Sequence, residues 1–183
     1  MTEREEEIVN GCLKGDPKYQ EVLYNTYSKK MYGVCLRYAP NDETARDLLQ
    51  EGFIKVFQNL DRFKGEGSFE GWVRRIMVNH SLEGLRKLSA KAQYVDVEDV
   101  HEVLQDNHHV NFNRYDMNYL LSKIQQLAPG YRAVFNLYII EGYQHNEIAE
   151  MLGISENTSK SQLSRARKLL QDSLEDVKKA YNV

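Results

Sequence analysis

The chain has 183 residues and 42% are hydrophobic, which is enough for one domain or two small ones with ordinary cores. Three prolines, few glycines and little β-branched alternation predict an all-helical protein. No run of about 18 apolar residues occurs, and the N-terminus MTEREEEIVN is acidic where a signal peptide would be basic. We therefore expect a cytoplasmic protein without membrane insertion. Cys12 and Cys35 have no CxxC spacing, so they are expected to be buried thiols rather than a metal or redox pair.

The net charge of −3 conceals an uneven distribution of charge along the chain. The stretch from residue 92 to residue 113 has no Lys or Arg and has five carboxylates, so the rest of the chain carries +2. These carboxylates belong to Asp96, Glu98, Asp99, Glu102 and Asp106. The stretch also loses helical periodicity, which predicts an acidic linker. His101, His108 and His109 lie within it without metal-ligand spacing, so no metal site and no cofactor are expected.

Two helices are predicted between residues 8 and 39. Gly15-Asp16-Pro17 separates them, because Asp16 can cap the second helix and proline suits its first turn. The second helix carries a long apolar stripe, made of Tyr19, Val22, Leu23, Tyr27, Met31, Val34, Cys35 and Tyr38. Pro40-Asn41-Asp42 is expected to end it.

The next helix is predicted from Asp42 or Glu43 to about Leu60. Its apolar residues keep i, i+3, i+4 spacing, and they are Ala45, Leu48, Leu49, Gly52, Phe53, Val56, Phe57 and Leu60. Beside this stripe lie Asp47, Gln50, Glu51 and Ile54. Asp47 and Glu51 are one turn apart and share a face. Such a pair could perform acid–base chemistry, but on an outward helical face it is more often solvated or paired with a partner's cations.

A loop from Asp61 to Ser68 precedes a helix predicted from Phe69 to about Leu88, and Ser68 is its expected cap. The side chains expected toward a core are Trp72, Ile76, Leu82 and Leu85, with Met77 and Val78 alongside. The opposite side carries Arg74, Arg75, Asn79, Arg86 and Lys87. Aromatic rings beside a flexible loop and a basic helix are typical of single-stranded nucleic acid binding. The alternative is that Phe69 and Trp72 pack the domain interior, and for Trp72 this alternative is favoured.

Helical periodicity returns at Tyr115. The first helix there has apolar residues at Met117, Leu120, Leu121, Ile124 and Leu127. Ala128-Pro129-Gly130 is expected to turn the chain. The following helix has apolar residues at Tyr131, Val134, Phe135, Leu137, Tyr138 and Ile140.

The stretch from Tyr143 to Leu170 has helix-turn-helix spacing. A short helix is predicted from about His145 to Leu152. Gly153 then supplies the left-handed turn residue, and Ser155 suits the cap of a second helix from about Glu156 to Gln171. This second helix buries Leu163 and Leu170. Its polar face is basic and suits a DNA major groove, although any helical hairpin with a solvated basic face would look similar.

Taken together, these stretches resemble a sigma factor of RNA polymerase, of the short extracytoplasmic-function (ECF) kind in the sigma-70 family. The resemblance covers roughly Lys14 to Leu174. The stretch from Asp47 to Phe63 is similar to the family's helix that docks on the clamp helices of the largest polymerase subunit. The stretch from Ser68 to Lys87 resembles the part that melts and reads the −10 promoter element. The stretch from Leu127 to Leu170 resembles the domain that reads the −35 element.

The resemblance implies two small helical domains: a region 2-like domain over residues 8–90 and a region 4-like domain over 115–178. An acidic linker over 91–114 would join them. It implies that the chain is not an enzyme. Its implied partners are core RNA polymerase, through the clamp helices and the flap of the second subunit, and promoter DNA. An anti-sigma protein is a further candidate partner. The acidic linker would either mimic nucleic acid in a basic polymerase channel or act as a solvated tether.

The family motifs also imply site residues. The core-polymerase-binding residues are Asp47, Leu48, Gln50, Glu51 and Ile54. The contacts to the −10 element are Gly65, Ser68, Phe69, Arg75, Asn79 and Glu83. The contacts to the −35 element are Glu156, Asn157, Thr158, Lys160, Ser161, Ser164, Arg165, Arg167 and Lys168. The last two are expected at phosphates.

Ser159 departs from the family pattern, because the second helix usually has a buried valine at this position. A hydroxyl there is expected to cost about 1 kcal/mol of packing if it finds a backbone acceptor. Asn157-Thr158 also replaces a common glycine-containing pair, so base preference cannot be carried over from relatives.

Two other functions are compatible with parts of the sequence. A helix-turn-helix regulator with an N-terminal sensor domain would bind duplex DNA alone, as a dimer. An all-helical small-molecule binder or enzyme would have a liganded pocket and would not bind polymerase. The Asp47–Phe63 stretch argues against the regulator, and no P-loop, HExxH or nucleophile constellation supports an enzyme.

Overall fold

The computed structural model describes the backbone of residues 1–92 and 117–180 and the side chains of residues 1–87 and 117–175. These residues form helices and no strand, which confirms the all-helical prediction. None of the described helices has a stretch long and apolar enough to cross a membrane. The chain divides into two compact units, Met1–Gly84 and Leu85–Val183. Most of the predicted acidic linker, with its three histidines, lies outside the described residues.

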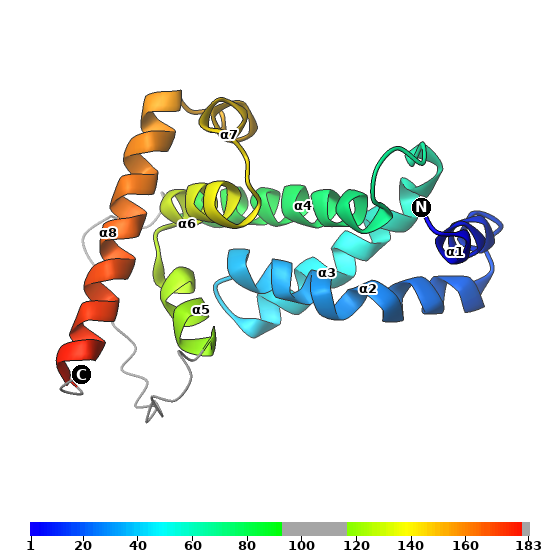
Figure 1. Ribbon diagram of the computed structural model, residues 1–183, viewed down its shortest axis with the longest axis horizontal. Coiled ribbons are helices and arrows are strands. Elements are labelled where there is room, and N and C mark those ends of the chain that lie inside the picture. The colour runs from blue at the N-terminus through cyan, green and yellow to red at the C-terminus, as the bar shows by residue number, and fades with distance from the viewer. Residues whose placement is uncertain (93–116, 181–183) are drawn as a thin grey trace. The chain divides into compact units, whose positions relative to one another are not determined.

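The first unit is built from four α-helices and a short 3₁₀ turn. They are α1 (Glu3–Leu13), α2 (Pro17–Tyr38), α3 (Asp42–Gln58), η1 (Leu60–Arg62) and α4 (Phe69–Ala92), of which the last two turns extend past the unit boundary (Figure 1). Side-chain caps set the helix starts; the cap at Asp16 was predicted, and the cap at Asn41 was not. The Asp16 carboxylate accepts from the Lys18 amide at 2.9 Å, and the Asn41 side chain accepts from the Thr44 amide at 2.8 Å.

The first helix begins at Glu3, five residues before the predicted start at residue 8. A reciprocal capping box explains the difference. The Thr2 hydroxyl accepts from the Glu5 amide at 3.2 Å, and the Glu5 carboxylate accepts from the Thr2 amide at 2.7 Å.

The core of the first unit lies where α4 packs on α2 and α3. Leu23, Met31 and Tyr38 of α2 are buried there. Gly52 allows α3 and α4 to approach closely, since a Cβ at this position would lie 2.3 Å from the Met77 sulfur. The prediction that both cysteines are buried thiols is confirmed.

The inward face of α4 agrees with the prediction at Met77, Val78, Leu82 and Leu85, which are buried, and differs from it at two positions. Phe69, Val73 and Met77 are buried, whereas Trp72 and Ile76, which were expected in the core, are only half-buried. The buried positions recur every four residues from Phe69, and this phase turns Trp72 and Ile76 toward the edge of the interface with α3.

The second unit contains α5 (Met117–Gln126), α6 (Pro129–Phe135), a π-helical turn η2 (Asn136–Ile140), α7 (His145–Leu152) and α8 (Glu156–Ala180). In Figure 1, α8 is the long helix against which α5, α6 and α7 pack. One core cluster of this unit is formed by Ile124, Leu127, Ala166 and Leu170, packed against Leu120, Tyr131 and Phe135.

Three features of the second unit differ from expectation. Met117 was placed on the apolar stripe but is 74% exposed. The helix after Pro129 widens into the π turn instead of continuing as α-helix. The second helix of the helix-turn-helix continues nine residues beyond Gln171, because the sequence after it contains no proline or glycine to end it.

Arg132 is a buried cation that joins α6 to the end of α5. Only 6% of the residue is exposed, and its guanidinium donates to the carbonyls of Leu127, at 3.0 Å, and Gln125. Burial lowers the pKa of Arg132 to about 10, so the group stays charged at neutral pH. It satisfies carbonyls that the end of a helix leaves without intrahelical partners.

Candidate functional site

The outward face of α3 carries a row of exposed polar side chains. Asp47, Gln50 and Glu51 are exposed, and Ile54 is 55% exposed at the end of the row. Leu48, which was assigned to the same docking set, is buried with 7% exposure. That assignment of Leu48 is corrected: its side chain supports the row from the core and is not available to a partner. We refer to Asp47, Gln50, Glu51 and Ile54 as the α3 row.

A buried histidine links the α3 row to α4. The side chain of His80 is 6% exposed, and its Nε2 atom lies 3.0 Å from a Glu51 oxygen. Its Nδ1 atom lies 3.6 Å from a Glu83 oxygen. Neither ring nitrogen makes a well-directed hydrogen bond within the described residues, so these contacts are best described as electrostatic.

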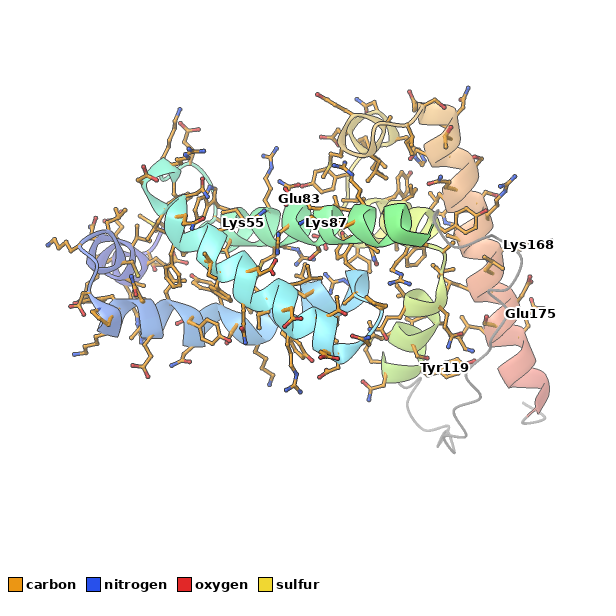
Figure 2. The ribbon with its side chains drawn as sticks, turned by 180° about the vertical axis from the view of Figure 1, so that it is seen from behind. Lys55, Glu83, Lys87, Tyr119, Lys168 and Glu175 are labelled. Atoms are coloured by element: carbon orange, nitrogen blue, oxygen red, sulfur yellow. The ribbon has the colours of Figure 1, made fainter. Side chains whose placement is uncertain are left out.

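The carboxylate of Glu83 is also paired with Lys55. The Lys55 ammonium donates to it at 2.6 Å, and this hydrogen bond lowers the pKa of Glu83 below its usual range. Figure 2 shows Lys55 of α3 and Glu83 of α4 facing each other across the two helices. Glu83, a predicted contact to the −10 element, is therefore engaged within the protein.

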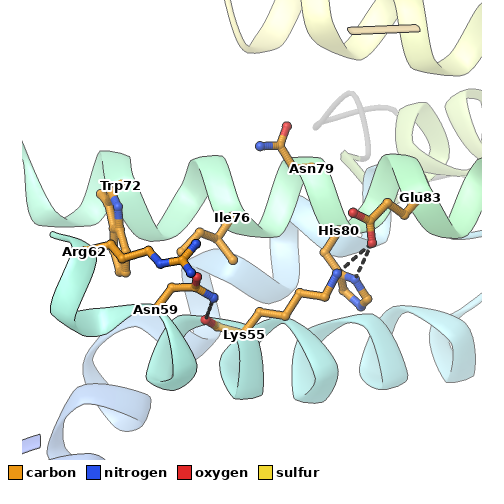
Figure 3. A pocket seen from close by; sticks show the side chains of 8 residues that line it. All are labelled: Lys55, Asn59, Arg62, Trp72, Ile76, Asn79, His80 and Glu83. Atoms are coloured by element: carbon orange, nitrogen blue, oxygen red, sulfur yellow. Dashed lines mark hydrogen bonds and ion pairs between the residues drawn. The ribbon is translucent and has the colours of Figure 1, made fainter. Parts of the chain in front are cut away.

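A hollow of about 270 Å³ lies between α3, η1 and α4. Figure 3 shows Trp72 and Ile76 from α4 on one side and Asn59 and Arg62 on the other. Lys55, Asn79, His80 and Glu83 complete its lining. A flat ring, an amide and cations around an open hollow suit a nucleic acid base and its phosphate. Two of the six predicted −10 residues, Asn79 and Glu83, are brought together here.

The loop before α4 has the backbone that its glycines predicted. Gly65 and Gly67 have φ of 75° and 78°, and the Ser68 hydroxyl accepts from the Gly71 amide at 3.3 Å, which confirms the cap. Gly65, Ser68 and Arg75 are exposed but do not line the hollow. Arg75 lies on the outer side of α4.

Phe69 does not occupy an exposed position. It is 1% exposed, and its ring lies 5.1 Å from Phe63 and 5.8 Å from Trp72, measured between ring centroids. The structure therefore contradicts a direct DNA contact by Phe69, which instead packs the interior. Phe63 and Trp72 are the half-buried rings next to the loop, and Phe63 was missed because it falls at the end of a helix-like stretch.

The helix-turn-helix forms as the sequence predicts. Gly153 takes the left-handed conformation with φ of 67°, and Ser155 accepts from the Thr158 amide at 3.0 Å. The Gln144 amide donates to Glu147 at 2.7 Å and holds the start of α7. Leu163 and Leu170 are buried, as predicted.

The outward face of α8 carries four cations and one carboxylate between residues 156 and 171. All nine predicted −35 residues lie on this helix, and all except the half-buried Thr158 are exposed. Lys160 pairs with Glu156 at 2.6 Å, and this hydrogen bond lowers the pKa of Glu156. The Arg165 guanidinium donates to the Tyr131 hydroxyl at 3.3 Å. These contacts orient two of the cations along the helix surface.

Ser159 is completely buried, and its hydroxyl lies 2.9 Å from Nδ1 of His145. The hydroxyl of Ser159 therefore pairs with a side chain fourteen residues earlier in the sequence, and not with the backbone acceptor that was expected. The His145 ring stacks on Tyr138 with 4.4 Å between ring centroids, and the Arg167 guanidinium lies 5.9 Å from the Tyr138 ring. The sequence offered no signal for this cluster beyond the unusual serine.

The cluster borders a second hollow, of about 490 Å³, at the side of α8. Its lining includes the three cations Lys160, Arg167 and Lys168 together with Ser164. Among the described residues, no set of three His, Cys, Asp or Glu side chains is arranged to hold a metal ion.

Comparison with known proteins identifies both units. Residues 23–91 match the family described as sigma-70 region 2, and residues 117–170 match sigma-70, region 4. The chain belongs to the sigma-70 family. Within it, the chain is 30% identical over 161 residues to the ECF RNA polymerase sigma factor SigE of Mycolicibacterium smegmatis, with 86% of this chain covered. The alignment spans only 62% of that relative's length.

A second relative matches over nearly the whole of both proteins. The ECF RNA polymerase sigma factor SigW of Bacillus subtilis is 29% identical, with 90% of this chain and 93% of SigW covered. The chain is therefore a sigma-70 family member of the ECF kind.

Solved structures share the fold. The sigma factor RpoE of Bartonella quintana, crystallised with the anti-sigma factor NepR, has a TM-score of 0.56 at 21% identity, covering 85% of this chain and 96% of RpoE.

Proposed function

We propose that this sigma factor binds core RNA polymerase and directs it to promoters by contacting both the −35 and the −10 elements and helping to open the DNA. The observation that carries the proposal is the presence, in one chain, of the exposed α3 row in the region 2 unit and a helix-turn-helix with a basic outward helix in the region 4 unit. A self-sufficient DNA-binding regulator has no need for the first of these surfaces.

The α3 row is the proposed docking surface for the clamp helices of the largest polymerase subunit. Two carboxylates and an amide in one exposed row suit a basic partner surface, and the adjacent Ile54 offers apolar area at its end. The region 4 unit is proposed to contact the flap of the second subunit. We place the functional domains at residues 8–90 and 115–178, joined by the acidic segment 91–114.

The hollow beside Trp72 is the proposed place for an unstacked base of the −10 element. Trp72 offers a partly exposed ring for stacking, Asn79 offers an amide, and Arg62 offers charge to a phosphate. Extruding a base from a duplex costs a few kcal/mol, which stacking and hydrogen bonds at such a site can offset. Gly65 and Ser68 of the neighbouring loop are exposed and could contact the same strand.

The outward face of α8 is the proposed reader of the −35 element. Asn157, Lys160 and Ser161 lie on its first turns, where a recognition helix enters the major groove. Arg167 and Lys168 follow on later turns and suit phosphates. Nucleotide chemistry belongs to the polymerase in this proposal, so the chain itself is not an enzyme, and it acts where the polymerase acts, in the cytoplasm.

An anti-sigma protein is a further candidate partner, since RpoE of Bartonella quintana was crystallised with one. Such a partner would block initiation if it covered the α3 row.

Run-off transcription with purified core polymerase tests the proposal. The full chain with core should initiate at defined sites in host genomic DNA, whereas core alone or the chain alone should not. Formation of a stable core complex should be followed in parallel by size-exclusion chromatography. If no core complex forms, or if the free chain binds the same sites as a dimer, the proposal is wrong and the regulator is the better description.

A further inference from the structure

His145 is the first residue of α7 and has no role in the interfaces proposed so far. Two contacts fix its ring. One face stacks on Tyr138 at 4.4 Å with 22° between the ring planes, and Nδ1 lies 2.9 Å from the buried Ser159 hydroxyl. Among the described residues, no hydrogen-bond partner is found for Nε2, the other ring nitrogen. The ring of His145 is thus half-buried and fixed by the stack and by the contact with Ser159, while Nε2 stays available. Such a ring is preorganised to form a hydrogen bond with a ligand.

The burial of Ser159 favours one direction for its contact with His145, the one in which the hydroxyl donates to the ring. Ser159 is completely buried, so its O–H group needs an acceptor, and the acceptor found for it is Nδ1 of His145. When the hydroxyl donates to Nδ1, the neutral imidazole carries its proton on Nε2. A doubly protonated ring would also present N–H at Nε2. In both forms, Nε2 is a hydrogen-bond donor.

The surroundings of the ring favour an anion as the acceptor. The hollow of about 490 Å³ that His145 borders is lined by Lys160, Arg167 and Lys168 and by no carboxylate. Glu156 is the first residue of α8, and Lys160 pairs with its carboxylate at 2.6 Å. Ser164 adds a hydroxyl to the lining. Three cations, a hydroxyl and an N–H donor around an open hollow match a phosphate group.

We propose that His145 donates from Nε2 to one backbone phosphate of the −35 DNA, and that Ser159 is the positioning residue that holds its ring and sets its tautomer. This inference rests on the proposed function of α8 as the −35 reader. The lysines and arginine attract phosphates from many directions, whereas a ring held by stacking and by a buried hydrogen bond offers one fixed direction. The pair therefore sets the register of α8 on the DNA backbone. It also gives a role to the serine at this buried position of α8.

The test uses the full chain in holoenzyme with core polymerase and promoter DNA selected by run-off transcription. Single phosphates along the −35 element are replaced one at a time by uncharged methylphosphonates. The wild type should lose about tenfold in affinity at one particular phosphate. His145→Phe keeps the aromatic stack. It should bind unmodified DNA more weakly than the wild type does, and it should lose less affinity than the wild type when that phosphate is neutralised.

Ser159→Val separates positioning from packing. Valine fills a buried helical site with no polar atom to satisfy, so thermal unfolding of the variant should occur at the wild-type temperature or above it. Binding to the −35 element should nevertheless fall toward the level of His145→Phe, and the double variant should be no weaker than His145→Phe alone. Lys168→Ala is a comparison variant that removes one cation from the lining of the same hollow. It should lower the salt dependence of binding and still respond to the His145 phosphate, whereas His145→Phe should leave the salt dependence unchanged.

Three results would overturn the inference. The first is an equal response of wild type and His145→Phe to every methylphosphonate. The second is wild-type promoter affinity in Ser159→Val. The third is a saturable shift of the His145 ring resonances on titration with inorganic phosphate at concentrations too low to compete with DNA, which would assign the site to a free anion. If the wild-type chain forms no holoenzyme at all, the proposed function fails as well, so the two failures are distinguishable.

Discussion

Asp47 offers the sharpest test of polymerase docking, because its replacement separates binding from folding. It is exposed on α3, and no ion pair is found for it within the described residues. Glu51, one turn later, is less suitable because its carboxylate lies 3.0 Å from the buried His80. Asp47→Lys should therefore change the free energy of unfolding by less than about 0.5 kcal/mol. Lysine is also a better helix former than aspartate, which favours the variant slightly.

The effect on docking should be far larger than the effect on folding. Reversing a charge that meets a cation at a close interface costs about 2–5 kcal/mol, and each 1.4 kcal/mol is a factor of ten in affinity. Core affinity should therefore fall at least about 30-fold. A fluorescence anisotropy titration of labelled chain with core polymerase measures this directly, and urea unfolding measures stability. Glu21→Lys, at an exposed position of α2, is the matched control and should bind normally.

If Asp47→Lys binds core within twofold of the wild type and Glu21→Lys weakens binding, the docking surface lies on α2 and not on the α3 row. If both variants bind normally, the charge of Asp47 does not contribute to docking.

Three further expectations follow from the structure. Gly153→Val places a branched side chain at φ of 67°, so melting followed by circular dichroism should show a loss of about 1–2 kcal/mol, whereas Gly153→Asn should lose less. Arg132→Met removes the buried donor at the end of α5 and should lower the free energy of unfolding by about 1–3 kcal/mol in urea titrations. Lys55 lowers the pKa of Glu83, so this pair stabilises the fold at pH values above the ordinary glutamate pKa. The stabilisation is lost as pH falls through the lowered pKa. Urea titrations at several pH values should therefore show that the free energy of unfolding falls less steeply with acid in Lys55→Met than in the wild type.

Local signals in the sequence were sufficient for most helix boundaries. Asp16, Ser68 and Ser155 each cap a helix with their own side chain, and Gly153 turns the chain through its own backbone. These interactions involve residues two or three apart, so no tertiary structure is needed to predict them. The period of apolar residues likewise predicted much of the buried face of each helix.

The errors arose where neighbouring elements decide the outcome. Leu48 and Phe69 belong to family motifs that contact partners, but a motif does not say which of its members faces the partner and which supports it from the core. The π turn after α6 has no local signal, and the pairing of His145 with Ser159 joins residues fourteen apart that only the folded helix-turn-helix brings together. His80 falls on the buried stripe of α4, at a position where a periodic pattern predicts an apolar residue.

His80 also has a consequence for how mutational data on this protein must be interpreted. One imidazole lies 3.0 Å from a carboxylate of the α3 row and 3.6 Å from a carboxylate beside the hollow. A substitution at Glu51 therefore changes the electrostatic surroundings of Glu83, and the reverse holds as well. An alanine scan that attributes every effect on α3 to polymerase docking and every effect on α4 to DNA opening would therefore assign part of each effect to the wrong function. The interaction energy from a double-mutant cycle, measured separately for core binding and for promoter opening, is the quantity that keeps the two apart.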